Sequence, residues 1–68
     1  MKISARNQFS GTVVALERGA VNGTVKVEIG GGNVVTSIIT NEAIDDLGLE
    51  VGQPATVLIK SSDVMLGR

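Results

Sequence analysis

The chain of 68 residues has no cysteine, histidine, tryptophan or tyrosine, and Phe9 is its single aromatic residue. Without cysteine it can form no disulfide, and without cysteine and histidine it lacks the usual ligands of structural zinc. The commonest general base and the strongest protein nucleophile are also missing, so we expect no enzymatic activity. A domain this short buries too little surface to be stable without disulfides or a structural metal. We therefore expect it to form oligomers.

Neither sign of charge dominates, because six lysines and arginines are balanced by seven acidic residues and the formal net charge is −1. Such a chain has no basic field to attract a polyanion, and one aromatic ring offers no platform for stacked bases, so we expect no nucleic-acid partner. No apolar run approaches the roughly 18 residues that span a bilayer, and residues 1–4 begin no apolar signal segment. We expect a cytoplasmic protein with no membrane contact.

Valine and isoleucine, with threonine beside them, dominate a composition that is 43% hydrophobic. These β-branched residues favour strands. Apolar runs and alternation predict strands at residues 11–18 (extending back toward 3–9), 24–29, 34–40, 55–60 and 64–66. Between 24 and 29, Val25, Val27 and Ile29 alternate with polar residues and are expected to face the core. The glycine-rich residues 30–33 predict a hairpin connection.

One segment changes its hydrophobic period from that of a strand to that of a helix. Asn41 can cap a helix, Glu42 is favourable in its first turn, and Gly48 is suited to end it. Three apolar residues share one face of this predicted helix: Ala43, Ile44 and Leu47. Strands, one short helix and further strands predict an all-β fold, a small OB-like β-barrel with the helix plugging one end.

Two of the predicted strands, at residues 34–40 and 55–60, are apolar on both faces. One small barrel cannot cover both faces of these strands, whereas a second subunit could. We therefore expect the chain to oligomerise through its strands.

Two polar segments interrupt the apolar strands, at residues 4–8 and 60–63. Together they offer the cations Arg6 and Lys60, several hydroxyls, side-chain amides and backbone N–H groups. This set suits a tetrahedral oxyanion, which needs donors on many sides and enough positive charge to offset its own. The alternative is that Arg6 and Lys60 are ordinary surface charges and that the serines serve turns; the residue types alone leave both interpretations open.

Four segments of the chain resemble the molybdenum-pterin-binding (Mop) domain family. The first is Ser-Ala-Arg-Asn-Gln at residues 4–8, followed by Gly-x-Val-Val at 11–14. The others are Val-Thr-Ser-Ile-Ile-Thr at 35–40, Leu-Gly-Leu-x-x-Gly at 47–52, and Val-x-Ile-Lys-Ser-Ser-Asp-Val-Met at 57–65. Together they cover nearly the whole chain in family order and spacing. The resemblance implies a single Mop domain at residues 1–68, of the stand-alone kind called a molbindin.

The resemblance also implies an OB-like barrel that assembles as a hexamer, a trimer of dimers, with oxyanion sites between subunits. The implied function is to bind, store or buffer molybdate or tungstate in the cell, with the metal held as an oxyanion and not by metal ligands of the protein. Motif positions imply these oxyanion-binding residues: Ser4, Ala5, Arg6 and Asn7 from one subunit, Lys60 and Ser61 from another, and Thr36 and Ser37 as further candidates. Phe9 and Ser10 stand where the family has an aliphatic and a basic residue, which lowers the positive charge near the site.

A different class of function is the alternative: an OB-type module that binds nucleic acid or another protein. Low basicity and the single aromatic residue count against nucleic acid. The family name also refers to a pterin, and nothing in the sequence separately supports pterin binding.

Overall fold

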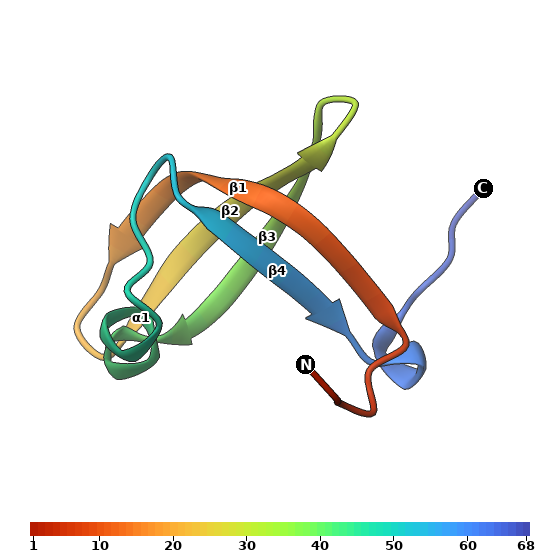
Figure 1. Ribbon diagram of the computed structural model, residues 1–68, viewed down its shortest axis with the longest axis horizontal. Coiled ribbons are helices and arrows are strands. Elements are labelled where there is room, and N and C mark those ends of the chain that lie inside the picture. The colour runs from red at the N-terminus through yellow and green to blue at the C-terminus, as the bar shows by residue number, and fades with distance from the viewer.

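The computed structural model describes residues 1–68 and shows a curled antiparallel sheet of four strands (Figure 1). The strands are β1 (Asn7–Arg18), β2 (Asn22–Gly30), β3 (Asn33–Thr40) and β4 (Pro54–Ile59), in the spatial order β3-β2-β1-β4. A short helix α1 (Asn41–Leu47) follows β3, and a single 3-10 turn η1 (Ser61–Asp63) follows β4. The prediction of an all-β chain with one short helix is confirmed. The sheet is a half-barrel, because its edge strands β3 and β4 do not pair with each other.

The long strand β1 joins the two halves of this sheet. Its first half pairs with β4, from Asn7 opposite Ile59 to Thr12 opposite Pro54, and its second half pairs with β2. The register with β2 is interrupted at Val14, which has no partner residue. Such a β-bulge bends a strand and increases its twist. The bend lets β1 pair with β4 in one half of the sheet and with β2 in the other. Figure 1 shows β1 as one long curved ribbon.

Gly11 lies just before this bend, where β1 approaches β2 closely. A Cβ atom on Gly11 would lie 2.4 Å from the carbonyl oxygen of Glu28 and 2.7 Å from Cγ1 of Val27. Both distances are shorter than any that a real Cβ atom tolerates, so only glycine fits without a shift of the backbone.

The β2–β3 hairpin is formed as the sequence predicts. Gly30, Gly31 and Gly32 have φ angles of +116°, +62° and +80°, in the region that glycine enters without steric cost. The side-chain amide of Asn33 donates a hydrogen bond of 2.9 Å to the carbonyl oxygen of Gly30, which closes the turn.

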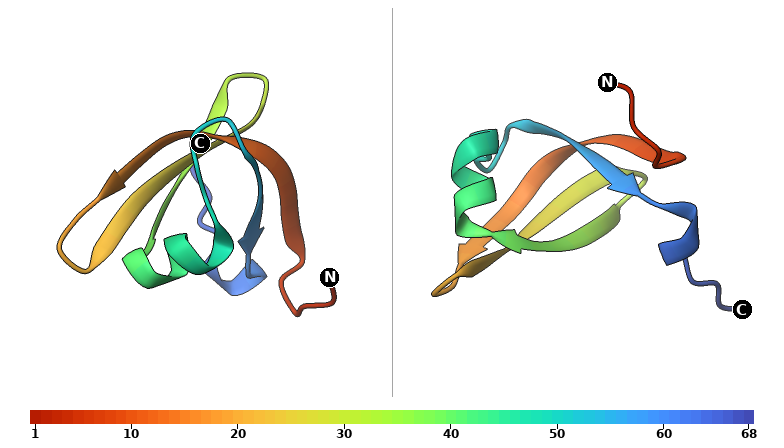
Figure 2. Two further views of the ribbon diagram at one scale, coloured as in Figure 1. Left: turned by 60° about the vertical axis from the view of Figure 1, so that its left-hand side comes forward. Right: turned by 90° about the horizontal axis from the view of Figure 1, so that it is seen from below.

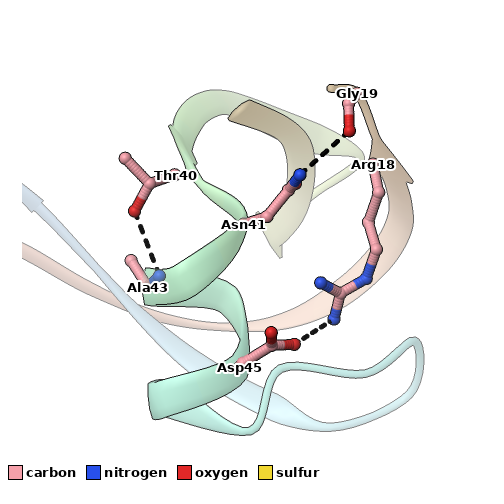
Figure 3. Close-up of polar contacts among 6 residues, drawn as sticks. All are labelled: Arg18, Gly19, Thr40, Asn41, Ala43 and Asp45. Carbon is pink, nitrogen blue, oxygen red and sulfur yellow. Dashed lines mark hydrogen bonds and ion pairs between the residues drawn. The ribbon is translucent and has the colours of Figure 1, made fainter. Parts of the chain in front are cut away.

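Helix α1 begins one residue earlier than the sequence indicated. Thr40 is the N-cap, and its Oγ1 accepts a hydrogen bond of 3.1 Å from the backbone N–H of Ala43 (Figure 3). The expectation that Asn41 caps the helix is wrong: Asn41 is the first helical residue, and its Nδ2 donates to the carbonyl oxygen of Gly19 at 2.9 Å. The amide of Asn41 therefore ties the helix to the β1–β2 turn. Gly48 ends the helix in the left-handed conformation, as predicted.

Four side chains form the core, and three of them come from the sheet: Val13, Val25 and Val27, none more than 4% exposed. The fourth is Ile44 of α1, which is 0% exposed and covers one end of the sheet. The helix therefore plugs the half-barrel as expected. Leu47 was expected on the same buried face but is 68% exposed, because it borders an open apolar hollow of the half-barrel instead of packing into the core.

The last predicted strand, at residues 64–66, is absent. After η1 the chain continues without regular structure, and Val64, Met65 and Leu66 are 45%, 92% and 95% exposed. A strand requires a neighbour for its backbone, and the single chain offers none to this segment. The prediction that the strand at 11–18 continues back into residues 3–9 is confirmed for residues 7–9 and wrong for residues 3–6, since β1 begins at Asn7.

The two-sided apolar strand at residues 34–40 corresponds to β3, and one of its faces is uncovered. Val34 and Ile38 are 48% and 70% exposed, whereas Val35 and Ile39 are half-buried. The chain thus leaves apolar surface of the kind that the sequence analysis expected a second subunit to cover. None of the helices combines the length and the apolar character needed to cross a membrane.

The close approach at Gly11 generates a stability prediction. Gly11→Ala should lower the free energy of unfolding by about 1–3 kcal/mol, because the added methyl group overpacks the contact with β2. Urea denaturation at equal protein concentration measures the effect. Gly67→Ala is the matched control, since a Cβ atom there meets nothing within 4 Å. Equal stability of the two variants would contradict the assigned role of Gly11.

Candidate functional site

The two polar segments of the sequence lie together at one end of the half-barrel. We call residues 4–7 and 60–63 the polar corner. The segments meet because Asn7 and Ile59 are the terminal pair of the β1–β4 ladder, so residue 6 and residue 60 leave the sheet side by side. Figure 2 (right) shows this end, with η1 and the N-terminal segment, opposite the end that α1 closes.

Side-chain amides hold the polar corner in shape. Nδ2 of Asn7, a half-buried residue, donates to the carbonyl oxygen of Ile59 at 3.1 Å and so links the two segments. Nε2 of Gln8 donates to the carbonyl oxygen of Ala5 at 3.0 Å, which turns the N-terminal segment back toward β1. On the other side, the N–H of Asp63 donates to the carbonyl oxygen of Lys60 at 2.8 Å and forms η1.

Several hydrogen-bond donors of the polar corner have no partner within the chain. The backbone N–H groups of Ser4, Ala5, Arg6 and Lys60 donate no hydrogen bond to the backbone. No side-chain oxygen accepts from them, and the hydroxyl groups of Ser4 and Ser61 make no hydrogen bond either. All these residues are exposed except Ala5, which is half-buried. The donors are therefore available to a ligand from solvent.

The charge of the polar corner is locally positive, although the whole chain is slightly negative. Arg6 and Lys60 carry two positive charges, and Asp63 carries one negative charge. The single ion pair of the chain joins Arg18 to Asp45 at 2.6 Å, near the helix and away from this corner (Figure 3). Arg6 and Lys60 are thus not neutralised by a carboxylate of their own chain.

This arrangement can hold a small anion. Uncommitted backbone N–H groups, hydroxyls and two cations are the groups that bind oxyanions by charge-assisted hydrogen bonds. A bare metal cation finds no equivalent set, since no three acidic side chains gather anywhere on the chain.

The other two candidates, Thr36 and Ser37, lie on β3, at the edge of the sheet opposite β4. Thr36 is exposed and lies opposite Lys26, whereas Ser37 is half-buried and borders the hollow of the half-barrel. The single chain does not bring them to the polar corner. Their part in a common site with Lys60 stays a prediction that requires a second copy of the chain.

The sequence analysis did not anticipate the hollow itself. It is an open space of about 620 Å³ whose lining is mainly apolar, and it lies between strands that the complete barrel would join. The signal for it was present in the apolar residues on both faces of the strands at 34–40 and 55–60.

Comparison with known proteins identifies relatives over the whole chain. The family model described as "TOBE domain" matches residues 3–66. A protein of Haemophilus influenzae named "Probable molybdenum-pterin-binding protein" is 52% identical over 98% of this chain and 97% of its own. Among solved structures, MopII from Clostridium pasteurianum superimposes with a TM-score of 0.91 at 46% identity and covers 98% of this chain and 100% of its own.

A second solved structure carries a ligand. ModG, described as a cytoplasmic molybdate-binding protein and solved with molybdate bound, gives a TM-score of 0.94 at 46% identity. The likeness covers 98% of this chain and 48% of the ModG chain. The matches in sequence and in structure both cover nearly the full length of this chain. The chain belongs to the TOBE-domain family and, within it, to the molybdenum-pterin-binding (Mop) proteins.

Proposed function

We propose that this protein binds molybdate or tungstate as the intact oxyanion and that it stores or buffers this ion in the cytoplasm. The observation that carries the proposal is the polar corner, where free N–H groups and two unpaired cations meet at one end of the sheet. Relatives named for binding molybdenum support it, as does the similarity to ModG, which is described as cytoplasmic. Nothing in the proposed function requires a reaction at the ion.

The residues of one polar corner have distinct roles in this proposal. The guanidinium of Arg6 and the ammonium of Lys60 offset the two negative charges of the oxyanion. The N–H groups of Ser4, Ala5 and Arg6 donate hydrogen bonds to its oxygen atoms, and Ser61 adds a hydroxyl. Asn7 acts mainly through position, because its amide is already bonded to Ile59.

One chain cannot surround the ion. A tetrahedral oxyanion has oxygen atoms on all sides, and the polar corner is an exposed projection that approaches from one side only. A second copy would supply the remaining donors, so that Ser4, Ala5, Arg6 and Asn7 of one subunit meet Lys60 and Ser61 of another. Thr36 and Ser37 become available to the site only in such an assembly. We propose a homo-oligomer, a hexamer built as a trimer of dimers.

Selectivity among oxyanions tests the nature of the site. Molybdate, tungstate and sulfate are all tetrahedral dianions, so charge alone cannot distinguish them. A rigid set of donors at a subunit junction should favour the longer metal–oxygen bonds, and isothermal titration should therefore show molybdate and tungstate binding well above sulfate. If sulfate competes with molybdate equally well at matched ionic strength, the polar corner is a nonspecific anion-binding patch.

Lys60→Ala tests the location of the site. Charge-assisted hydrogen bonds contribute roughly 1.5–3 kcal/mol each, so the variant should bind molybdate at least about tenfold more weakly. Lys26→Ala is the matched control, because Lys26 is an exposed lysine of β2 that lies outside the polar corner. Wild-type affinity in Lys60→Ala, or an equal loss in Lys26→Ala, would move the site elsewhere.

Native mass spectrometry with and without molybdate tests the assembly. Each subunit has a mass of 7.0 kDa, and we expect six subunits together with bound ions in one species. A folded monomer that binds molybdate alone would contradict the interfacial site while leaving the ligand itself in place.

A further inference from the structure

The N-terminal segment, residues 1–6, is held by a single hydrogen bond. The strands and helices begin only at Asn7, and no backbone hydrogen bond outside them involves residues 1–6. Among the side chains, only Gln8 bonds to this segment, with Nε2 donating to the carbonyl oxygen of Ala5 at 3.0 Å. Figure 1 shows the segment turning sharply before it enters β1. Gln8 is therefore the one polar contact that fixes this turn.

Gln8 is anchored in the sheet, unlike the segment that it holds. It lies in β1, opposite Leu58 of β4. Because Asn7 and Gln8 are consecutive strand residues, their side chains leave opposite faces of the sheet. The amide of Asn7 joins the ends of β1 and β4 through the carbonyl oxygen of Ile59, whereas the amide of Gln8 bonds to the segment before β1. A rigid strand thus supplies the donor that orders a segment outside it.

The hydrogen bond at Ala5 determines where the N–H of Arg6 points. The carbonyl of Ala5 and the N–H of Arg6 belong to one planar trans peptide, in which the two groups point in opposite directions. Since the carbonyl is turned toward Gln8, the N–H is turned away from Gln8, and it has no partner within the chain. If this peptide rotated, it would present a carbonyl oxygen, which carries partial negative charge, in place of the donor.

The rest of the polar corner follows the same pattern, with carbonyl oxygens engaged and N–H groups free. Four carbonyl oxygens accept hydrogen bonds from within the chain: those of Ala5, Ile59, Lys60 and Ser61. An oxyanion is repelled by free carbonyl oxygens and attracted by free N–H groups, so this pattern favours it. Of the four engaged carbonyls, only that of Ala5 lies in the segment that also provides the free N–H groups of Ser4, Ala5 and Arg6.

We propose that Gln8 is a positioning residue of the oxyanion site, which holds the Ala5–Arg6 peptide so that the N–H of Arg6 faces the ion. Gln8 does not itself bind the ion, because its Nε2 is engaged by Ala5. Ordering a backbone segment costs conformational entropy. A donor that is oriented before the ion arrives avoids this cost at the moment of binding, which raises the affinity. The inference rests on the proposed binding of an oxyanion at the polar corner.

Gln8→Met tests this role, because methionine keeps the length of the side chain and removes the donor without adding charge. Isothermal titration should show molybdate binding about three- to tenfold more weakly, the range expected for the loss of one neutral hydrogen bond. Gln53→Met is the matched control and should bind like the wild type. Gln53 is the other glutamine of the chain, and its exposed side chain makes no hydrogen bond.

NMR relaxation of the molybdate-free protein, labelled with ¹⁵N, provides a second readout that a merely structural role would not move. In Gln8→Met the order parameters of the Ala5 and Arg6 amides should fall, while those of β1 stay at the wild-type level. The urea midpoint should also stay unchanged, because Gln8 is exposed and its bond lies outside the sheet.

The outcomes separate this inference from the proposed function. Wild-type affinity in Gln8→Met would overturn the positioning role and leave the oxyanion site in place. Weaker binding with unchanged order parameters would also overturn it, since Gln8 would then act by touching the ion. Weaker binding together with a lower urea midpoint would make Gln8 a residue of general stability instead. If the wild-type chain itself binds no molybdate, the proposed function and the role of Gln8 are both overturned.

Discussion

The pairing of β1 on both sides is the constraint on which the rest of the structure depends. One strand of twelve residues holds β4 along its first half and β2 along its second half. This is possible only because the strand bends at the bulge of Val14 and because Gly11 has no side chain where the strand approaches Glu28. The β1–β4 ladder ends with Asn7 opposite Ile59, and this pairing places the two polar segments side by side.

The chain buries few apolar side chains. Curling four strands around one helix encloses only Val13, Val25, Val27 and Ile44, while the hollow, the outer face of β3 and residues 64–66 keep their apolar residues in contact with water. Hydrophobic burial is the main favourable contribution to folding. Because the core of one chain is so small, association of chains that buries further apolar surface is strongly favoured. The proposed assembly of the chain with itself would cover such apolar residues.

Much of the fold was predictable because its signals are local. Alternation of Val25, Val27 and Ile29 identified a strand, the glycines at 30–32 identified a hairpin, and Gly48 marked the end of the helix. The errors occurred where a neighbour decided the outcome. Thr40 caps the helix, whereas the side-chain amide of Asn41 donates to the carbonyl oxygen of Gly19, which lies 22 residues earlier in the chain. The segment at 64–66 has the composition of a strand, but a strand exists only when another strand pairs with it.

For the candidate site, the sequence by itself determined which groups are available: Arg6, Lys60 and the serines can bind an anion, and without histidine and cysteine the usual ligands of structural zinc are missing. The resemblance to the Mop family pointed to the same residues. Only the tertiary structure decided that residues 6 and 60 are neighbours, because the β1–β4 register that joins Asn7 to Ile59 is a pairing across 52 positions. It also decided that Thr36 and Ser37 lie at the opposite edge. Local composition determines which groups a chain can offer to a ligand, whereas strand order and register determine which of them can touch the same ion.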